Sequence, residues 1–108
     1  MRTMATASAP IDAAVLEFLK IAFCCPVLEG YGMTENAGGA SCTWPNDPVV
    51  GHVGGPVKPV KWRLKDVPEM GYLGSDKPYP RGEICMKGSI VFSGYFKRPD
   101  KNAEAFDE

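Results

Sequence analysis

Residues 2–39 alternate between extended and helical patterns, and this order constrains the fold more than any other feature of the chain. Asp12 precedes residues 13–23, where apolar side chains recur at helical spacing, and its carboxylate can accept the free amides of a first helical turn. Pro26 marks the end of that stretch, because proline cannot continue a helix and disfavours helical geometry at the residue before it. We therefore predict a helix over residues 13–23. Its buried face is expected to consist of Val15, Leu16, Leu19, Ala22 and Phe23.

Extended segments are predicted on both sides of this helix, over residues 2–7 and residues 27–29, and a glycine-rich loop follows the second of them. A strand, a helix and a second strand that ends in such a loop form the arrangement that binds ligands in open α/β sheets, at the carboxyl ends of the strands. The fold class predicted for this part of the chain is therefore α/β, and the loop is the expected ligand site.

The loop itself carries the chemistry, because residues 30–35 read Gly-Tyr-Gly-Met-Thr-Glu. The ring of Tyr31 can cover a base, bare glycine backbone lets phosphate oxygens approach, the hydroxyl of Thr34 can donate to phosphate, and the carboxylate of Glu35 can face Mg²⁺. An enzyme that holds a nucleoside triphosphate with its metal needs such a set. Each residue also has a structural alternative. Thr34 and Glu35 could begin a helix, and Tyr31 could pack in a core.

The chain changes in character after this loop. Residues 44–48 contain two prolines with Asn and Asp, which is typical of a loop. Residues 60–65 alternate apolar and basic side chains, the period of a half-buried strand. Two more short strands are predicted over residues 84–87 and 90–92, and Asn102 is expected to cap a last helix.

Composition and charge exclude several functional classes. Twelve basic and thirteen acidic residues leave a formal net charge of -1, which gives no electrostatic footprint for nucleic acid or an anionic membrane. The longest apolar run, residues 15–28, is interrupted by charges and a proline, whereas crossing a bilayer takes about 20 mostly apolar residues. The four cysteines form no C-x-x-C pair, and without a signal peptide they are expected to be reduced in an intracellular compartment. His52 has no nucleophile motif beside it and is expected to be structural.

The order and spacing of these motifs resemble the adenylate-forming (AMP-binding) ligases, a superfamily of acyl-CoA synthetases, peptide-synthetase adenylation domains and luciferases. The resemblance rests on residues 30–35, on Gly-Glu-Ile-Cys-Met-Lys-Gly at residues 82–88 and on Val-Phe-Ser-Gly-Tyr at residues 91–95. Residues 51–56 and 65–72 are most similar to the eukaryotic long-chain fatty acyl-CoA synthetases. The resemblance covers nearly all of the chain.

This resemblance implies how the chain is organised. Residues 1–108 would be part of an AMP-binding domain, the large N-terminal domain of these enzymes. Residues 1–43 would form the end of an α/β sheet subdomain with the nucleotide loop, and residues 44–108 the start of a distorted β-barrel. Because the strands would then lack their family partners, we expect exposed apolar faces on the chain alone.

The resemblance also implies a two-step reaction. A long-chain fatty carboxylate attacks the α-phosphorus of ATP to give acyl-adenylate and pyrophosphate, and the thiol of coenzyme A then displaces AMP. Thr34 would contact the α-phosphate and Glu35 would hold Mg²⁺, so these two are the expected catalytic residues. Tyr31 would lie against adenine.

Further contacts are implied around this pair. Gly32 and Met33 would also bind the nucleotide, and Gly30 and Gly32 would border the acyl substrate and the adenylate. Ser8 and Ala9 match a strand-to-helix turn that borders adenine, where the family usually has Ala at the position of Ser8. The remaining motif residues are expected to be scaffold: Glu83, Gly88, Gly94 and Tyr95.

The implied partners are small molecules: ATP with Mg²⁺, a long-chain fatty acid and coenzyme A. No nucleic acid and no membrane segment in this chain are expected, although family members are often found at endoplasmic reticulum, peroxisome or lipid droplet membranes. The chain lacks the family's lysine-bearing phosphate loop and its small C-terminal domain, so it is expected to be a fragment that is inactive alone. The alternatives are a fragment of a medium-chain or aryl acid ligase, or a non-catalytic nucleotide-binding remnant.

Overall fold

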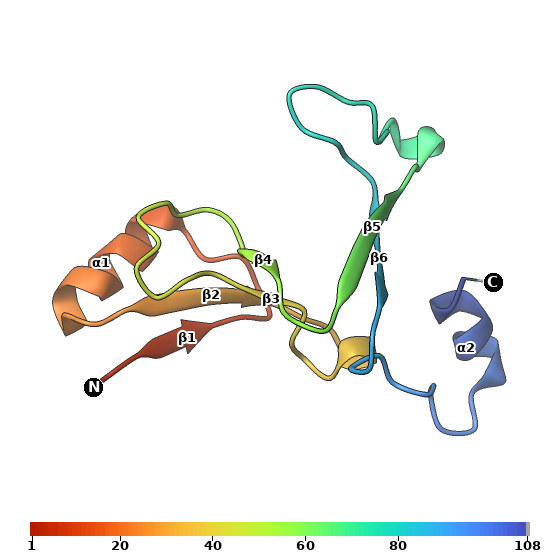
Figure 1. Ribbon diagram of the computed structural model, residues 1–108, viewed down its shortest axis with the longest axis horizontal. Coiled ribbons are helices and arrows are strands. Elements are labelled where there is room, and N and C mark those ends of the chain that lie inside the picture. The colour runs from red at the N-terminus through yellow and green to blue at the C-terminus, as the bar shows by residue number, and fades with distance from the viewer. Residues whose placement is uncertain (108) are drawn as a thin grey trace.

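The computed structural model describes residues 1–107, which form two small β-sheets, two helices and their connecting loops (Figure 1). The first sheet and its helix comprise β1 (Met4–Thr6), α1 (Ala13–Phe23), β2 (Val27–Tyr31), β3 (Ser41–Cys42) and β4 (Gly55–Pro56). The second part comprises β5 (Lys61–Lys65), β6 (Glu83–Lys87) and α2 (Pro99–Ala105). Two short 3-10 helices, η1 (Thr34–Asn36) and η2 (Pro68–Met70), lie in the connections.

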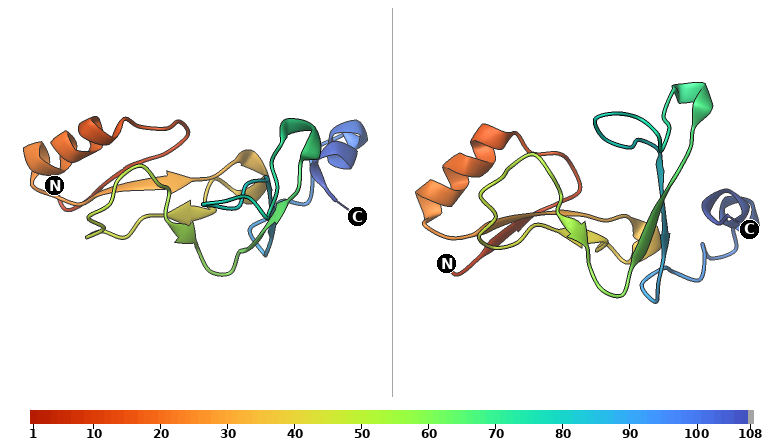
Figure 2. Two further views of the ribbon diagram at one scale, coloured as in Figure 1. Left: turned by 90° about the horizontal axis from the view of Figure 1, so that it is seen from above. Right: turned by 45° about the horizontal axis from the view of Figure 1, so that its top comes forward.

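The β1–α1–β2 unit confirms the predicted α/β fold class. Strands β1 and β2 are parallel, with Thr6 opposite Glu29, and α1 connects them over one face of the sheet (Figure 2). Helix α1 begins and ends where the sequence predicts. The Asp12 carboxylate accepts the amides of Ala14 and Val15 at 2.9 and 3.3 Å, which confirms it as the N-cap.

The first sheet continues beyond β2 with antiparallel strands, in the order β1-β2-β3-β4. The predicted strand over residues 27–29 extends two residues further, because Gly30 pairs with Cys42 and Tyr31 pairs with Ser41 in β3. Gly30 and Tyr31 are therefore strand residues. The glycine-rich loop proper begins at Gly32 and returns the chain to β3.

Strands β5 and β6 form a separate antiparallel ribbon, which stands at a steep angle to the first sheet (Figure 1). They confirm two of the predicted strands. Each begins within one residue of the predicted start, and each ends at the predicted residue. The first sheet reaches Pro56 and the ribbon begins at Lys61. The subdomain boundary expected between residues 43 and 44 stays a prediction.

Two local predictions in the last part of the chain are wrong. Residues 90–92 form no strand, because their backbone turns toward η1, where the Phe92 amide donates to the carbonyl of Glu35 at 2.8 Å. Asn102 is not an N-cap. It lies inside α2, which begins after Arg98 with Pro99 at its first position, and its side-chain oxygen accepts the amide of Tyr95 at 2.7 Å.

The core of the described residues is small. Its buried apolar residues are Leu16, Cys25, Val27, Ala40 and Val60. On α1 only Leu16 is buried and Leu19 is half-buried, so the expected burial of Val15, Ala22 and Phe23 is wrong for the part of the chain described. Only the Leu16 side of the helix lies on the sheet, and Phe18 and Ile21 are 65% and 76% exposed. Between residues 1 and 107, neither helix has the length and apolar content that a membrane span needs.

The end of α2 is tied to the β5–β6 ribbon by charge. The Asp107 carboxylate accepts hydrogen bonds from Lys65 at 2.7 Å and from Arg63 at 2.8 Å. These two cations, Lys65 first, lower the pKa of Asp107 below its ordinary value. Because all three side chains are partly exposed, water screens this interaction and its contribution to stability is modest.

Replacing Asp12 by Ala should lower the free energy of unfolding by about 1 kcal/mol, because two amides of the first turn lose their acceptor. Urea unfolding followed by circular dichroism at 222 nm measures the change. Glu17→Ala on the exposed side of the same helix is the matched control and should stay within about 0.5 kcal/mol. Equal stability of the two variants would contradict the capping role.

The contact between α2 and β5 should weaken in acid. A carboxyl group whose pKa is lowered by folding stabilises the folded state above its unfolded pKa, and that contribution is lost as the pH falls through the folded value. We expect the side-chain NMR signals of Lys65 and Arg63, the two partners of Asp107, to shift below the ordinary aspartate pKa of about 3.9. Asp107→Asn should remove this transition, and its survival in that variant would assign it to another group.

Candidate functional site

The hexapeptide at residues 30–35 lies where the two sheets meet. It begins in the last two residues of β2 and ends in η1, which Figure 1 shows (gold) at the base of the β5–β6 ribbon. This is the carboxyl end of the parallel β1–β2 pair, the edge at which open α/β sheets bind ligands. The sequence-predicted site residues are therefore gathered at one end of the first sheet.

The turn after β2 is closed by Asn36, a residue that the sequence analysis missed. Asn36 is 2% exposed, and its side-chain oxygen accepts the amide of Met33 at 2.9 Å. The carbonyl of Met33 in turn accepts the amide of Gly38 at 3.0 Å. Thr34 and Glu35 do start a short helix, as the structural alternative proposed, but the cap comes from Asn36 and not from Thr34. The Thr34 side chain is exposed.

Two glycines of the hexapeptide are packed against the chain's own backbone. A Cβ atom at Gly32 would overlap the carbonyl group of Gly38, and one at Gly30 would lie 3.1 Å from the carbonyl oxygen of Ser41. The tight return from β2 to β3 therefore requires glycine at residue 32. The expected contact of Gly30 and Gly32 with the acyl substrate and the adenylate stays a prediction.

Tyr31 and Met33 lie together on the side of the loop that faces the ribbon. The half-buried Tyr31 ring and the Trp62 ring of β5 form a T-shaped pair, with ring centroids 6.1 Å apart and planes at 75°. The Tyr31 hydroxyl donates to the sulfur of Met33 at 3.8 Å. Sequence reasoning did not single out Trp62, because nothing local marks a strand residue as the partner of a distant loop.

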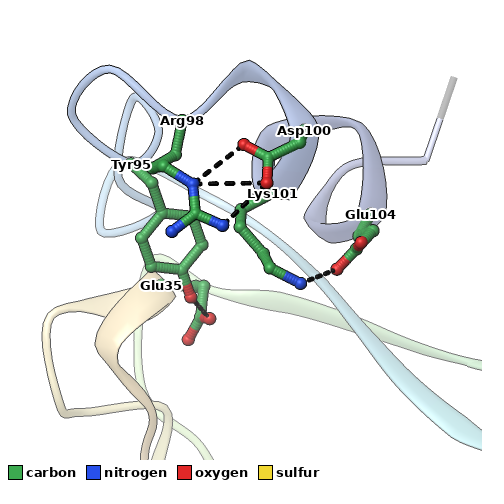
Figure 3. Close-up of polar contacts among 6 residues, drawn as sticks. All are labelled: Glu35, Tyr95, Arg98, Asp100, Lys101 and Glu104. Atoms are coloured by element: carbon green, nitrogen blue, oxygen red, sulfur yellow. Dashed lines mark hydrogen bonds and ion pairs between the residues drawn. The ribbon is translucent and has the colours of Figure 1, made fainter.

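Glu35 is held by a residue from the far end of the chain. The Tyr95 hydroxyl donates to its Oε1 atom across a sequence separation of 60 residues (Figure 3). This hydrogen bond lowers the pKa of Glu35 and raises the pKa of Tyr95. Glu35 is therefore an ionised acceptor at neutral pH. Tyr95 was expected to be scaffold, and no spacing in the sequence links it to Glu35.

A groove of about 910 Å³ opens beside Glu35, between η1, the β5–β6 ribbon and the end of α2. Met33, Glu35 and Asn36 line it from the loop, and Trp62 and Phe92 line it from the second part of the chain. Of the predicted site residues, the structure thus brings Met33 and Glu35 to this groove.

Ser8 and Ala9 lie in an exposed turn between β1 and α1, outside the groove. Because Thr6 stands opposite Glu29 in the parallel pair, Ser8 and Tyr31 leave the sheet at the same edge. Ser8 has a positive φ of 77°, so the backbone turns sharply there. The expected contact of Ser8 and Ala9 with a nucleotide stays a prediction.

The residues at this edge fit a magnesium ion only together with a ligand that supplies further oxygens. Within residues 1–107 no group of three or more His, Cys, Asp and Glu side chains could hold a metal by itself. Mg²⁺ characteristically keeps several waters and binds one or two carboxylates together with phosphate oxygens. Glu35, with one oxygen occupied by Tyr95 and the carboxylate ionised, has the chemistry of such a one-carboxylate ligand.

Comparison with known proteins relates the chain to one family. The sequence profile described as AMP-binding enzyme matches residues 1–96. Fatty acyl-CoA synthetase A of Dictyostelium discoideum is 54% identical over 101 residues, which cover 94% of this chain and 15% of that protein. Long chain acyl-CoA synthetase 7, peroxisomal, of Arabidopsis thaliana is 45% identical over 107 residues, which cover 99% of this chain and 15% of that protein. The chain thus spans about 15% of the length of these curated relatives.

A solved structure shows the same fold. It is the A-PCP didomain of carboxylic acid reductase from Segniliparus rugosus in complex with AMP, with a TM-score of 0.81 and 37% sequence identity. The match covers 98% of this chain and 14% of that one. The described α/β arrangement is therefore a slice of a larger fold of this kind.

Gly32→Ala should destabilise the chain by roughly 1–3 kcal/mol, because the added methyl group overlaps the backbone of Gly38 and forces the turn open. Urea unfolding measures the loss. Gly39→Ala is the matched control, since a Cβ atom there meets nothing within 4 Å, and it should change stability by less than about 0.5 kcal/mol. If both variants were equally stable, the closed turn would not need its glycine.

Proposed function

This chain belongs to the AMP-binding enzyme family, and from that premise we propose that it forms the nucleotide-contacting part of a long-chain fatty acid–CoA ligase. The single observation that carries the proposal is the placement of Glu35. It is an ionised, half-buried carboxylate at the ligand-binding edge of a parallel strand pair, beside a groove.

Thr34 and Glu35 act on the triphosphate of ATP. The exposed hydroxyl of Thr34 donates to the α-phosphate, and Glu35 holds Mg²⁺ through its carboxylate. When bound, the ion neutralises charge on the phosphate oxygens. Both residues belong to the short helix η1, so the donor and the carboxylate occupy adjacent positions of one turn.

The remaining residues of the edge bind the rest of the nucleotide and the acyl group. Tyr31 packs against adenine, and Met33 beside it completes that surface. Ser8 and Ala9 approach adenine from the neighbouring strand end. The adenylate and the acyl chain pass along the backbone of Gly30 and Gly32, which have no side chain to block them.

The reaction proceeds in two steps. A carboxylate oxygen of the fatty acid forms a bond to the α-phosphorus as pyrophosphate leaves. The thiol of coenzyme A then gives its proton to water, and its sulfur bonds to the acyl carbon as AMP leaves. The first step spreads negative charge over phosphate oxygens, so catalysis is mostly positioning and charge neutralisation. Residues 30–35 contribute to that first step.

Two findings support the choice of acid and acceptor. The curated relatives are named fatty acyl-CoA and long chain acyl-CoA synthetases, which supports a long-chain fatty acid and coenzyme A as substrates. The carboxylic acid reductase didomain was solved in complex with AMP, which supports the adenylation step. It says nothing about coenzyme A as the acceptor. An intracellular location is proposed with this function, since the Arabidopsis relative is named as peroxisomal.

The test is a chimera in which residues 1–108 replace the matching segment of the Dictyostelium synthetase. With ATP, Mg²⁺ and palmitate the chimera should release pyrophosphate, and Glu35→Ala should cut that rate by about 10²–10³-fold, since a group that stabilises developing charge is lost. Glu69→Ala, an exposed carboxylate in η2, is the matched control and should keep the rate.

An unchanged rate in the Glu35→Ala chimera would remove the metal assignment. Omitting coenzyme A separates the two steps, because pyrophosphate release needs only the first. Isothermal titration of the 108-residue chain with AMP then measures how much of the nucleotide site it retains without the rest of such an enzyme.

A further inference from the structure

Within residues 1–107, the hydrogen bond from Tyr95 to Glu35 is the one by which a side chain of the second part of the chain reaches a proposed catalytic residue. Figure 3 shows the phenol lying directly against the carboxylate, with its hydroxyl donating to Oε1. The backbone adds a second tie nearby, since the amide of Phe92 donates to the carbonyl of Glu35 at 2.8 Å. Both the side chain and the backbone of Glu35 are thus held by residues 92–95.

Tyr95 is itself held by two contacts and by the backbone conformation before it. Its amide donates to the side-chain oxygen of Asn102 in α2 at 2.7 Å. Its ring and the Phe92 ring lie edge to face with centroids 4.8 Å apart, and the Phe92 ring stacks on Phe106 with centroids 5.7 Å apart. Gly94 before it has a φ of 130°, a conformation that favours glycine. The direction of the hydroxyl group is therefore set by the packing of α2 and not by solvent.

A neutral donor suits a carboxylate that must bind a cation. A lysine or arginine at the same place would cancel the negative charge and compete with the metal for it. The phenol fixes the carboxylate in orientation and leaves its charge for the ion. Partners that hydrogen-bond to metal-binding carboxylates orient them in this way, and Mg²⁺ demands near-ideal ligand geometry.

We propose that Tyr95 is a positioning residue for nucleotide-bound magnesium: its hydroxyl holds Oε1 of Glu35 so that the other oxygen is presented to the metal. This inference rests on the proposed function of Glu35. It assigns to the second part of the chain a role in the metal site, beyond building the fold.

The experiment uses the chimera described above with Tyr95→Phe, which keeps the ring on Phe92 and removes only the hydroxyl. At saturating ATP and palmitate, the Mg²⁺ concentration that gives half-maximal pyrophosphate release should rise about 10–100-fold. The rate at saturating Mg²⁺ should fall by less than about threefold, because a positioned carboxylate is recovered once the metal is bound. Tyr79→Phe, whose side chain is 78% exposed, is the control and should match the parent.

If Tyr95 only stabilised the fold, Tyr95→Phe would change the rate or the stability without changing the dependence on Mg²⁺. Loss of rate or stability with an unchanged half-saturating Mg²⁺ concentration would overturn the inference. A second readout covers a poorly folding variant: electron paramagnetic resonance of Mn²⁺ with ATP reports metal affinity on the folded fraction, and unchanged affinity would equally overturn it. Combining Tyr95→Phe with Glu35→Gln should add no further weakening, because the tyrosine acts through the carboxylate.

The two proposals fail separately. If Glu35→Ala abolishes adenylation while Tyr95→Phe leaves the Mg²⁺ dependence unchanged, Tyr95 is not the positioning residue and the proposed function stands. If Glu35→Ala leaves adenylation intact, the metal assignment falls, and the inference about Tyr95 falls with it.

Discussion

The hydrogen bond from Tyr95 to Glu35 joins the two parts of this molecule beside the groove, at the proposed site. The first sheet and the β5–β6 ribbon stand at a steep angle, and the buried core of the described residues is small (Figure 1). Their relation at the site therefore depends on a few directed contacts. The Tyr95 bond, the Phe92 amide on the Glu35 carbonyl and the Tyr31–Trp62 ring contact are the main ones.

The loop beside this junction is built from backbone closure rather than from hydrophobic packing. Asn36 is buried to satisfy the amide of Met33, and Gly32 lets the backbone of Gly38 approach. A loop closed in this way presents its remaining polar groups outward without relying on a large core. Helix α1 shows the complementary situation, because most of its apolar surface is exposed in the described residues.

Sequence patterns correctly predicted those elements whose ends are set by interactions between residues close together in the chain. Asp12 and Pro26 bound helix α1, since capping and the geometry before proline act within a few residues. The same reasoning was wrong for residues 90–92 and for Asn102. In both places the hydrogen bond joins residues that do not belong to the same helix or strand. The Phe92 amide goes to Glu35, and the Asn102 side chain goes to the Tyr95 amide.

The sequence by itself determined the chemical content of the proposed site, because one hexapeptide contains the ring, the hydroxyl and the carboxylate. It also determined the α/β order that places this hexapeptide at a strand end. Only the tertiary structure decided which groups hold those side chains. Tyr95 and Trp62 reach Glu35 and Tyr31 through the packing of a separate ribbon and helix, and periodicity along a chain contains no record of such pairings.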